Sequence, residues 1–240
     1  MTKIAIIGAG GWGTALAIVL AGARESRPLA LWARENDVLA SLQSEGENSV
    51  FLPGFCVPQH VEVTGELEPA LRGAEIVIGA MPAAHARAMY SAALPFLRPE
   101  MRFVSATKGL EPETLLRVTE VMTQVLAPKF RPRIVALSGP SFAKEVARGD
   151  PTAVVVASTD REAAKEIQRE FSGPTLRLYT NEDVIGVELG GALKNIIAIA
   201  GGASEGLGLG HNTIAALITR GLAEMTRLGT ALGARQDTLG

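Results

Sequence analysis

The sequence contains few cysteine, histidine and aromatic residues. Its single cysteine, Cys56, excludes an internal disulfide and is typical of a reducing compartment. The histidines, His60, His85 and His211, have neither metal-ligand spacing nor a shared helix face, so we predict no metal site. Neither positive nor negative charge predominates. The net charge is −2 without a basic cluster, which argues against nucleic acid or a membrane surface as a partner.

Long uninterrupted hydrophobic runs are absent as well. The most apolar helical stretch, residues 184–203, contains Glu188, Lys194 and five glycines, so we predict an internal helix and no membrane insertion. The N-terminus has no basic region before a long apolar core, and Ile4 already begins a structural strand. We therefore expect no signal peptide and a cytoplasmic protein.

What the sequence does have is a glycine-rich turn near its start. An apolar run, Ile4–Ile7, predicts a buried strand, and Thr14 begins a helical pattern. Between them the glycines have G-x-G-x-x-G spacing: Gly8 permits a tight turn, Gly10 allows a pyrophosphate to approach, and Gly13 lets helix and strand pack closely. Phosphates would bind the free N–H groups at the helix N-terminus, which predicts a dinucleotide site. The alternative is a βα turn without a ligand.

Apolar strands and helical segments alternate along the first three quarters of the chain. This alternation predicts an α/β fold whose N-terminal domain is a doubly wound, Rossmann-type, mainly parallel sheet. An all-helical segment follows, and we place the boundary between residues 1–186 and 187–240. Asn181 is the expected N-cap of its first helix. The expected strands are 4–7, 29–32, 61–64, 75–79, 103–106, 134–137 and 153–157, and the expected helices include 66–73, 83–97, 112–125 and 160–171.

Several of the predicted strands end in polar or glycine-containing turns. Ligands of open parallel sheets bind beyond the carboxyl ends of the strands. We therefore expect one cleft to collect the glycine turn and the segments that follow four other strands. These segments are Ala33-Arg34-Glu35, Met81-Pro82, Lys108-Gly109 and Gly139-Pro140-Ser141.

Arg34 bears on the choice of cofactor. NAD-specific folds place an acidic residue at the end of the second strand, where it binds the ribose 2′-hydroxyl. Here Arg34 comes first and Glu35 follows. A guanidinium binds a 2′-phosphate, which favours NADP(H) over NAD(H). The alternative is that Arg34 is a solvated surface charge and Glu35 binds the ribose.

Lys194 is the strongest candidate for a catalytic residue in the helical segment, because mostly small residues share its helix face. An amine in such a groove could exchange a proton at lowered pKa, or it could be a lysine at a domain interface. Lys108 is a second candidate cation or a solvated turn residue. Ser141 contacts substrate or caps the following helix. Trp12 packs beside the glycine turn or contacts the cofactor.

Six motifs stand out along the chain: GAGGWGTALA at 8–17, LWAR at 31–34, ATKGLE at 106–111, LSGPSFAKEVA at 137–147, ELGGALKNIIAIAGG at 188–202 and AALITRGLAEMTRLG at 215–229. Together they closely resemble the bacterial type of NAD(P)-dependent glycerol-3-phosphate dehydrogenase. The resemblance covers essentially the whole chain, and the last three motifs are specific to that family. It implies a cytoplasmic oxidoreductase, expected to be a homodimer, that supplies glycerol 3-phosphate for phospholipid synthesis.

The resemblance also implies roles for individual residues. Lys194 is the proton acceptor on the C2 hydroxyl of glycerol 3-phosphate, with Asn195 beside it, while hydride passes to the nicotinamide of NAD(H) or NADP(H). The small-molecule substrate, a triose phosphate, is contacted by Lys108, Gly139 and Ser141. Cofactor contacts beyond the glycine motif are Gly11, Trp12, Arg34, Lys108 and Ala143.

The chain also departs from the family pattern. It stops at Gly240, before an Arg-Asn pair that grips the substrate phosphate and before the aspartate that partners the lysine. Glu205, His211 and Ile214 replace the family's usual residues near the glycine loop. Two alternative functions follow: a related β-hydroxyacid-type dehydrogenase, and a dinucleotide-binding chain that does not catalyse turnover.

Overall fold

The protein is built on one large, mainly parallel β-sheet. The computed structural model describes residues 2–23 and 27–239. The eight strands of this sheet lie in the order β10-β9-β8-β7-β6-β1-β2-β5, and a separate short ribbon pairs β3 with β4. The strands are β1 (Ile4–Ile7), β2 (Leu29–Trp32), β3 (Glu47–Asn48), β4 (Leu52–Cys56), β5 (Val61–Thr64), β6 (Ile76–Gly79), β7 (Arg102–Ser105), β8 (Arg133–Ser138), β9 (Thr152–Ala157) and β10 (Leu176–Asn181).

Helices cover both faces of this sheet, as a doubly wound fold requires. Alternate residues of β1 separate the two cores: Ile4 and Ile6 pack with α1, α2 and α7, whereas Ala5 and Ile7 pack with α3, α4 and α5. The predicted fold class is confirmed. The helices are α1 (Gly11–Gly22), α2 (Asn36–Glu45), α3 (Leu67–Leu71), α4 (Ala83–Ala93), α5 (Val118–Leu126), α6 (Ala143–Arg148), α7 (Arg161–Phe171), α8 (Val184–Gly206), α9 (His211–Ala231) and α10 (Gln236–Leu239).

The sheet reverses direction between β8 and β9. All pairings from β5 to β8 are parallel, β8 pairs with β9 antiparallel, and β9 pairs with β10 parallel. We predicted β9 but not β10, although its sequence alternates buried Leu176 and Leu178 with exposed Arg177 and Tyr179. That period of two is typical of a strand with one solvated face.

Two predicted helix boundaries are wrong. The helix expected over 112–125 begins only at Val118. Before it, Leu110 bridges to Arg117, and Leu115 has a left-handed φ of 57°, so the segment forms a closed loop. The N-cap of α8 is Asp183 and not Asn181, because the Asp183 carboxylate accepts a hydrogen bond from the Gly186 N–H at 2.8 Å.

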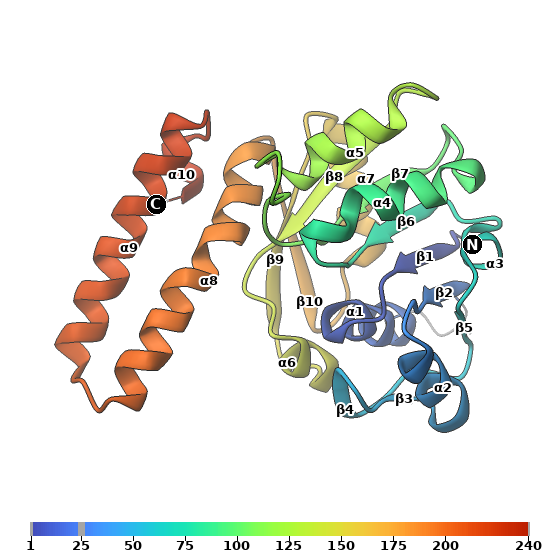
Figure 1. The fold of residues 1–240 in the computed structure, drawn as a ribbon, viewed down its shortest axis with the longest axis horizontal. Helices are drawn as coiled ribbons and strands as arrows, with labels where there is room; N and C mark the ends of the chain where they lie inside the picture. The colour runs from blue at the N-terminus through green and yellow to red at the C-terminus, as the bar shows by residue number, and fades with distance from the viewer. Residues whose placement is uncertain (1, 24–26, 240) are drawn as a thin grey trace.

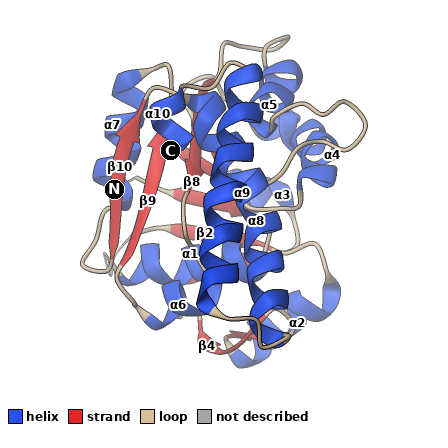
Figure 2. Cartoon of the chain, turned by 90° about the vertical axis from the view of Figure 1, so that its left-hand side faces the viewer, coloured by secondary structure: helices blue, strands red, loops and turns tan. Residues whose placement is uncertain are grey.

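After β10 the described chain is entirely helical. Helices α8 and α9 form an antiparallel pair that stands beside the sheet, and the short α10 packs on both (Figures 1 and 2). By length and composition α8 could cross a membrane, and 28% of its most apolar window is buried within the structure. It packs on the sheet through Val187, which contacts Ala136 of β8 and Ala157 of β9. The internal position of this helix and the division at residue 186 stay predictions.

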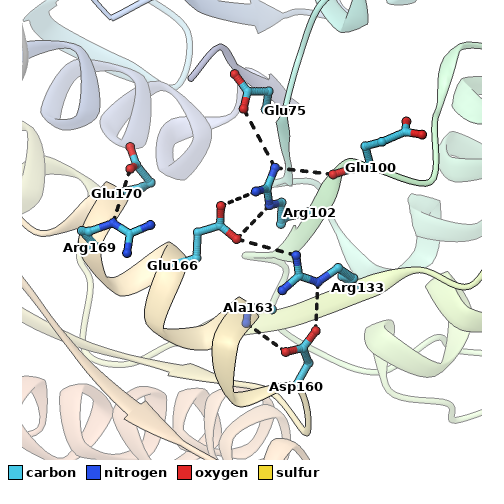
Figure 3. Close-up of polar contacts among 9 residues, drawn as sticks. All are labelled: Glu75, Glu100, Arg102, Arg133, Asp160, Ala163, Glu166, Arg169 and Glu170. Carbon is cyan, nitrogen blue, oxygen red and sulfur yellow. Dashed lines mark hydrogen bonds and ion pairs between the residues drawn. The ribbon is translucent and has the colours of Figure 1, made fainter. Parts of the chain in front are cut away.

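An ion-pair cluster holds the amino ends of β7 and β8 against α7 (Figure 3). The Glu166 carboxylate accepts a hydrogen bond from Arg102 Nε at 2.9 Å and lies 3.8 Å from Arg133 Nη1. Arg133 Nε donates to Asp160 at 2.9 Å, and this ion pair lowers the pKa of Asp160. The cluster lies at the edge of the sheet opposite the carboxyl ends of these strands.

Candidate active site

The predicted glycine turn leads from β1 into α1, and three of its glycines lie too close to the protein's own backbone for a side chain. A Cβ at Gly11 would lie 2.9 Å from the Phe51 carbonyl oxygen. Gly8 has a φ of 114°, and a Cβ there would lie 2.4 Å from the Ala80 carbonyl oxygen. A Cβ at Gly13 would lie 1.9 Å from the Gly8 carbonyl oxygen. These contacts fit the tight turn and the close helix–strand packing that the spacing predicts.

Gly10 differs from its neighbours because a Cβ there would meet nothing within 4 Å. It is the N-cap of α1 and has an ordinary φ of −71°, and no side chain caps the first turn of that helix. Open space therefore lies beside Gly10 at the N-terminus of α1, which is the positive end of the helix dipole. This arrangement fits a dinucleotide pyrophosphate.

A cavity of about 440 Å³ opens beside this turn, over the carboxyl ends of β1, β2 and β6. Arg34 and Glu35 line it and form an exposed ion pair, with Arg34 Nη2 2.8 Å from Glu35 Oε1. The adenosine side of a dinucleotide fits a cavity with apolar walls and a charged rim. The lining residues are Gly8, Ala9, Gly10, Trp32, Arg34, Glu35, Phe51, Ala80, Met81, Pro82, His85, Ala88 and Met89.

Several residues around this cavity were not assigned from the sequence. Phe51, His85 and Met89 line it directly, and the buried Asn48 holds the turn from outside. Asn48 donates to the Ala9 carbonyl at 2.7 Å and accepts from the Phe51 N–H at 2.9 Å. No pattern singles out Asn48 or Phe51. His85 lies at the start of α4, directly after the recognised strand end, and that position was a usable signal.

Two half-buried lysines lie at the same edge of the sheet. Lys108, three residues after the end of β7, donates to Ser141 Oγ at 3.0 Å. Lys194, in the middle of α8, donates to the carbonyl oxygen of Gly139. Ser141 Oγ in turn donates to that same carbonyl at 3.2 Å. The loop after β8 therefore joins lysines that lie far apart in the sequence.

The electrostatics of this pair favour proton exchange at Lys194. Burial, and after it the nearby positive charge of Lys108, lowers the pKa of Lys194 to about 8. Burial also lowers the pKa of Lys108. A lysine whose pKa is near the working pH can both accept and donate a proton.

Trp12 and Ala143 connect the lysines to the glycine turn. The Lys108 ammonium lies 5.7 Å from the centre of the Trp12 ring, within reach of a cation–π interaction. Trp12 Nε1 is buried and, within residues 2–23 and 27–239, has no hydrogen-bond partner. Trp12 and Ala143 belong to the same apolar cluster, and a Cβ at Gly11 would lie 3.6 Å from that of Ala143.

The structure does not bring every polar candidate to this site. Asn195, beside Lys194 in sequence, is exposed, and so are Cys56 and His211. Among the residues that the structure describes, no cluster of three or more His, Cys, Asp or Glu side chains could hold a metal ion.

Comparison with known proteins agrees with the geometry. Two family models match: the N-terminus of NAD-dependent glycerol-3-phosphate dehydrogenase over residues 3–164, and its C-terminus over residues 183–240. A glycerol-3-phosphate dehydrogenase [NAD(P)+] of Koribacter versatilis is 56% identical over 100% of this chain and 71% of its own length. The corresponding relative from Acidobacterium capsulatum is 54% identical over 100% of this chain and 72% of its own length.

Solved structures give the same result. The crystal structure of glycerol-3-phosphate dehydrogenase from Coxiella burnetii matches with a TM-score of 0.92 and 40% identity, covering 99% of this chain and 71% of that one. A ketopantoate reductase from Ralstonia eutropha, with a TM-score of 0.59 and 18% identity over 82% of this chain and 61% of that one, shares only the fold. A Rossmann-type glycine turn, a lysine pair at the same sheet edge and two matching family models thus agree, and the chain belongs to the NAD-dependent glycerol-3-phosphate dehydrogenase family.

Proposed function

We propose that this chain interconverts sn-glycerol 3-phosphate and dihydroxyacetone phosphate at the edge of the sheet that carries Gly10, Lys108 and Lys194. The observation that carries the proposal is the bridge between Lys194 and Lys108 through Gly139 and Ser141, beside a turn fitted to a dinucleotide. The bound nicotinamide supplies or accepts the hydride at C2 of the substrate. The protein binds, aligns and moves the proton.

Each residue has a distinct task in this proposal. The N–H groups after Gly10 bind the pyrophosphate, while Gly8 and Gly13 set the backbone of the turn. Gly11, Trp12 and Ala143 form the wall toward the nicotinamide. We assign the 2′-phosphate or ribose contact to Arg34.

Substrate contacts come from the lysine pair and its loop. Lys108 and Ser141 bind substrate oxygens, and Gly139 keeps the loop backbone close to β9: its φ is 142°, and a Cβ there would lie 2.9 Å from Val154 Cα. In the oxidative direction Lys194 accepts the proton of the C2 hydroxyl as hydride leaves C2. In the reductive direction Lys194 returns that proton to the oxygen.

The first test is to mix the purified 240-residue chain with NADPH and dihydroxyacetone phosphate and follow the loss of reduced nicotinamide. Substrate-dependent turnover supports the proposal. The chain spans about 71% of its relative from Koribacter versatilis, so NADPH binding without turnover would favour the binding-only alternative. Preference for a hydroxy acid over a triose phosphate would favour a β-hydroxyacid dehydrogenase. Cytoplasmic location, a homodimer and a supply of glycerol 3-phosphate for phospholipid synthesis stay predictions.

Arg34 offers a test of cofactor choice. We expect Arg34→Ala to weaken NADPH binding about 10- to 100-fold, because a charge-assisted contact to the 2′-phosphate contributes about 1.5–3 kcal/mol. NADH binding should change little. Isothermal titration with both nucleotides measures the difference. If Glu35 binds the ribose instead, Arg34→Ala leaves both affinities unchanged and Glu35→Gln weakens NADH.

The pH dependence tests the role of Lys194. Oxidation of glycerol 3-phosphate requires the neutral amine, so its kcat should rise as pH increases through about 8, the lowered pKa of Lys194. Reduction of dihydroxyacetone phosphate requires the protonated amine, so its kcat should fall above that pH. Steady-state profiles in both directions, at constant ionic strength, measure this. Parallel pH profiles in the two directions would contradict the assignment.

A further inference from the structure

A buried carboxylate on α8 lies outside the set of residues assigned so far. Glu188 is only 9% exposed, and its oxygens accept three hydrogen bonds at the start of α5. The donors are Thr119 N at 2.9 Å, Thr119 Oγ1 at 2.5 Å and Arg117 Nη1 at 2.8 Å. The carboxylate therefore joins α8 to the N-terminus of α5, where the helix dipole favours negative charge.

The start of α5 also controls the loop that carries Lys108. Arg117 bridges back to Leu110, and the Glu111 N–H donates to the Leu116 carbonyl at 2.9 Å, so the loop is closed at its base. Lys108 lies two residues before this base. Holding Arg117 in place consequently limits where the backbone of Lys108 can lie.

The same carboxylate fixes the position of α8 along its axis. Lys194 lies less than two helical turns beyond Glu188. Between them, Gly191 rests against the end of β8, because a Cβ there would lie 2.2 Å from Ser138 Oγ. The helix is therefore held at Glu188 and Gly191, one turn apart, immediately before the lysine that reaches the Gly139 carbonyl.

We propose that Glu188 is a positioning residue: through Arg117 and Thr119 it sets the placement of Lys194 relative to Lys108 across the substrate site. The proposal rests on the function proposed above and extends it. A purely structural role predicts that the loss of Glu188 lowers stability alone. A positioning role predicts, in addition, a change at Lys194 itself.

The surroundings of Glu188 explain why a charge is kept there. Burial raises the pKa of this carboxyl, while Thr119 and Arg117 oppose the shift by favouring the ionised form. Arg117 also pairs with Glu120, with Nη2 2.9 Å from Oε1, so the groups that lose their acceptor when Glu188 is removed are the two Thr119 donors. The contact therefore gives a defined geometry at the junction of α5 and α8, which an apolar contact of similar size would not specify.

The test measures Lys194 directly and needs no turnover. The whole chain and its Glu188→Gln variant are labelled briefly with acetic anhydride across a range of pH, and mass spectrometry gives the extent of modification of each lysine. Relaxed placement should move the reactivity midpoint of Lys194 upward from about 8, because burial and the neighbouring Lys108 hold it down. Direct loss of a nearby negative charge would move it downward, so the two explanations differ in sign.

Glu166→Gln is the matched control, because it also removes a carboxylate that pairs with arginine, at the opposite edge of the sheet. We expect both variants to lose stability in urea and only Glu188→Gln to shift Lys194. If the wild-type chain turns over, kcat should fall about 100-fold in Glu188→Gln, the cost of an ångström-scale misplacement, with the Kd for NADPH unchanged. Lack of turnover in the wild-type chain would count against the proposed function and leave the labelling test intact.

An unchanged or lowered midpoint for Lys194 in folded Glu188→Gln would overturn the proposal. If that variant does not fold, Thr119→Val replaces it, because it removes the shortest of the three hydrogen bonds and retains the backbone donor. The expected upward shift is then smaller, and its absence in folded Thr119→Val would equally overturn the proposal.

Discussion

Replacing Lys194 with methionine is expected to lower kcat for reduction of dihydroxyacetone phosphate by about 10²- to 10⁴-fold, the usual contribution of a general acid or base. Methionine keeps much of the side-chain volume in the half-buried groove but cannot carry a proton. The Kd for NADPH should stay within about twofold, because the cavity beside Gly10 has no contact with Lys194. Stopped-flow turnover and nucleotide titration separate the two effects.

Lys129→Met is the matched control for this variant. Lys129 is exposed and donates to the Leu94 carbonyl, away from the carboxyl ends of the strands. It should leave kcat unchanged. Turnover that survives in Lys194→Met at more than about a tenth of the wild-type rate would remove Lys194 from the proton-transfer step.

The second large effect is expected at the glycine turn. One alanine substitution there should lower the stability of the protein, and another should weaken NADPH binding. Gly13→Ala brings a Cβ to 1.9 Å from the Gly8 carbonyl oxygen, so the helix and the strand must separate. Steric strain of this kind typically costs about 1–3 kcal/mol and occasionally more. We expect a lower urea midpoint for the protein without nucleotide.

Gly10→Ala should have the reverse profile. Its Cβ meets no protein atom within 4 Å, and its backbone angle suits alanine, so stability without nucleotide should be unchanged or slightly higher. The added methyl group would occupy the space assigned to the pyrophosphate. NADPH should then bind about 10- to 100-fold more weakly and protect less against thermal unfolding. Unchanged NADPH affinity in Gly10→Ala would contradict the assignment of the phosphate site.

The parts of the fold that follow from local pattern were predictable. The strands predicted at 29–32 and 61–64 have the expected bounds, and the helix predicted over 160–171 is α7, with Asp160 as its N-cap. The helical prediction over 112–117 fails because a tertiary contact decides that segment. The Glu111 carboxylate is held by Arg87 of α4, with Nε 2.8 Å away, and its backbone belongs to a closed loop.

The same distinction between local pattern and tertiary contact applies to the candidate site. The strand-end rule correctly gathers the glycine turn, Lys108 and Gly139 at one edge, because each follows a strand recognisable from its own residues. Three other contacts form between segments that are far apart in the sequence. Lys108 donates to Ser141, Phe51 lines the cavity beside the glycine turn, and Glu188 accepts from α5. No local periodicity encodes such contacts.

The reversal between β8 and β9 has a consequence for the insertions and deletions that this chain can tolerate. Because β9 and β10 run antiparallel to β8, α8 starts near the amino end of β8 and runs along it to the edge where Lys194 reaches the Gly139 carbonyl. From Val184 to Lys194 the helix rises about 15 Å, close to the length of six-residue β8, about 17 Å. One residue added or removed in these turns would rotate the lysine by about 100°. Insertions and deletions in related sequences should therefore occur in the loop after α8 and not between Asp183 and Lys194.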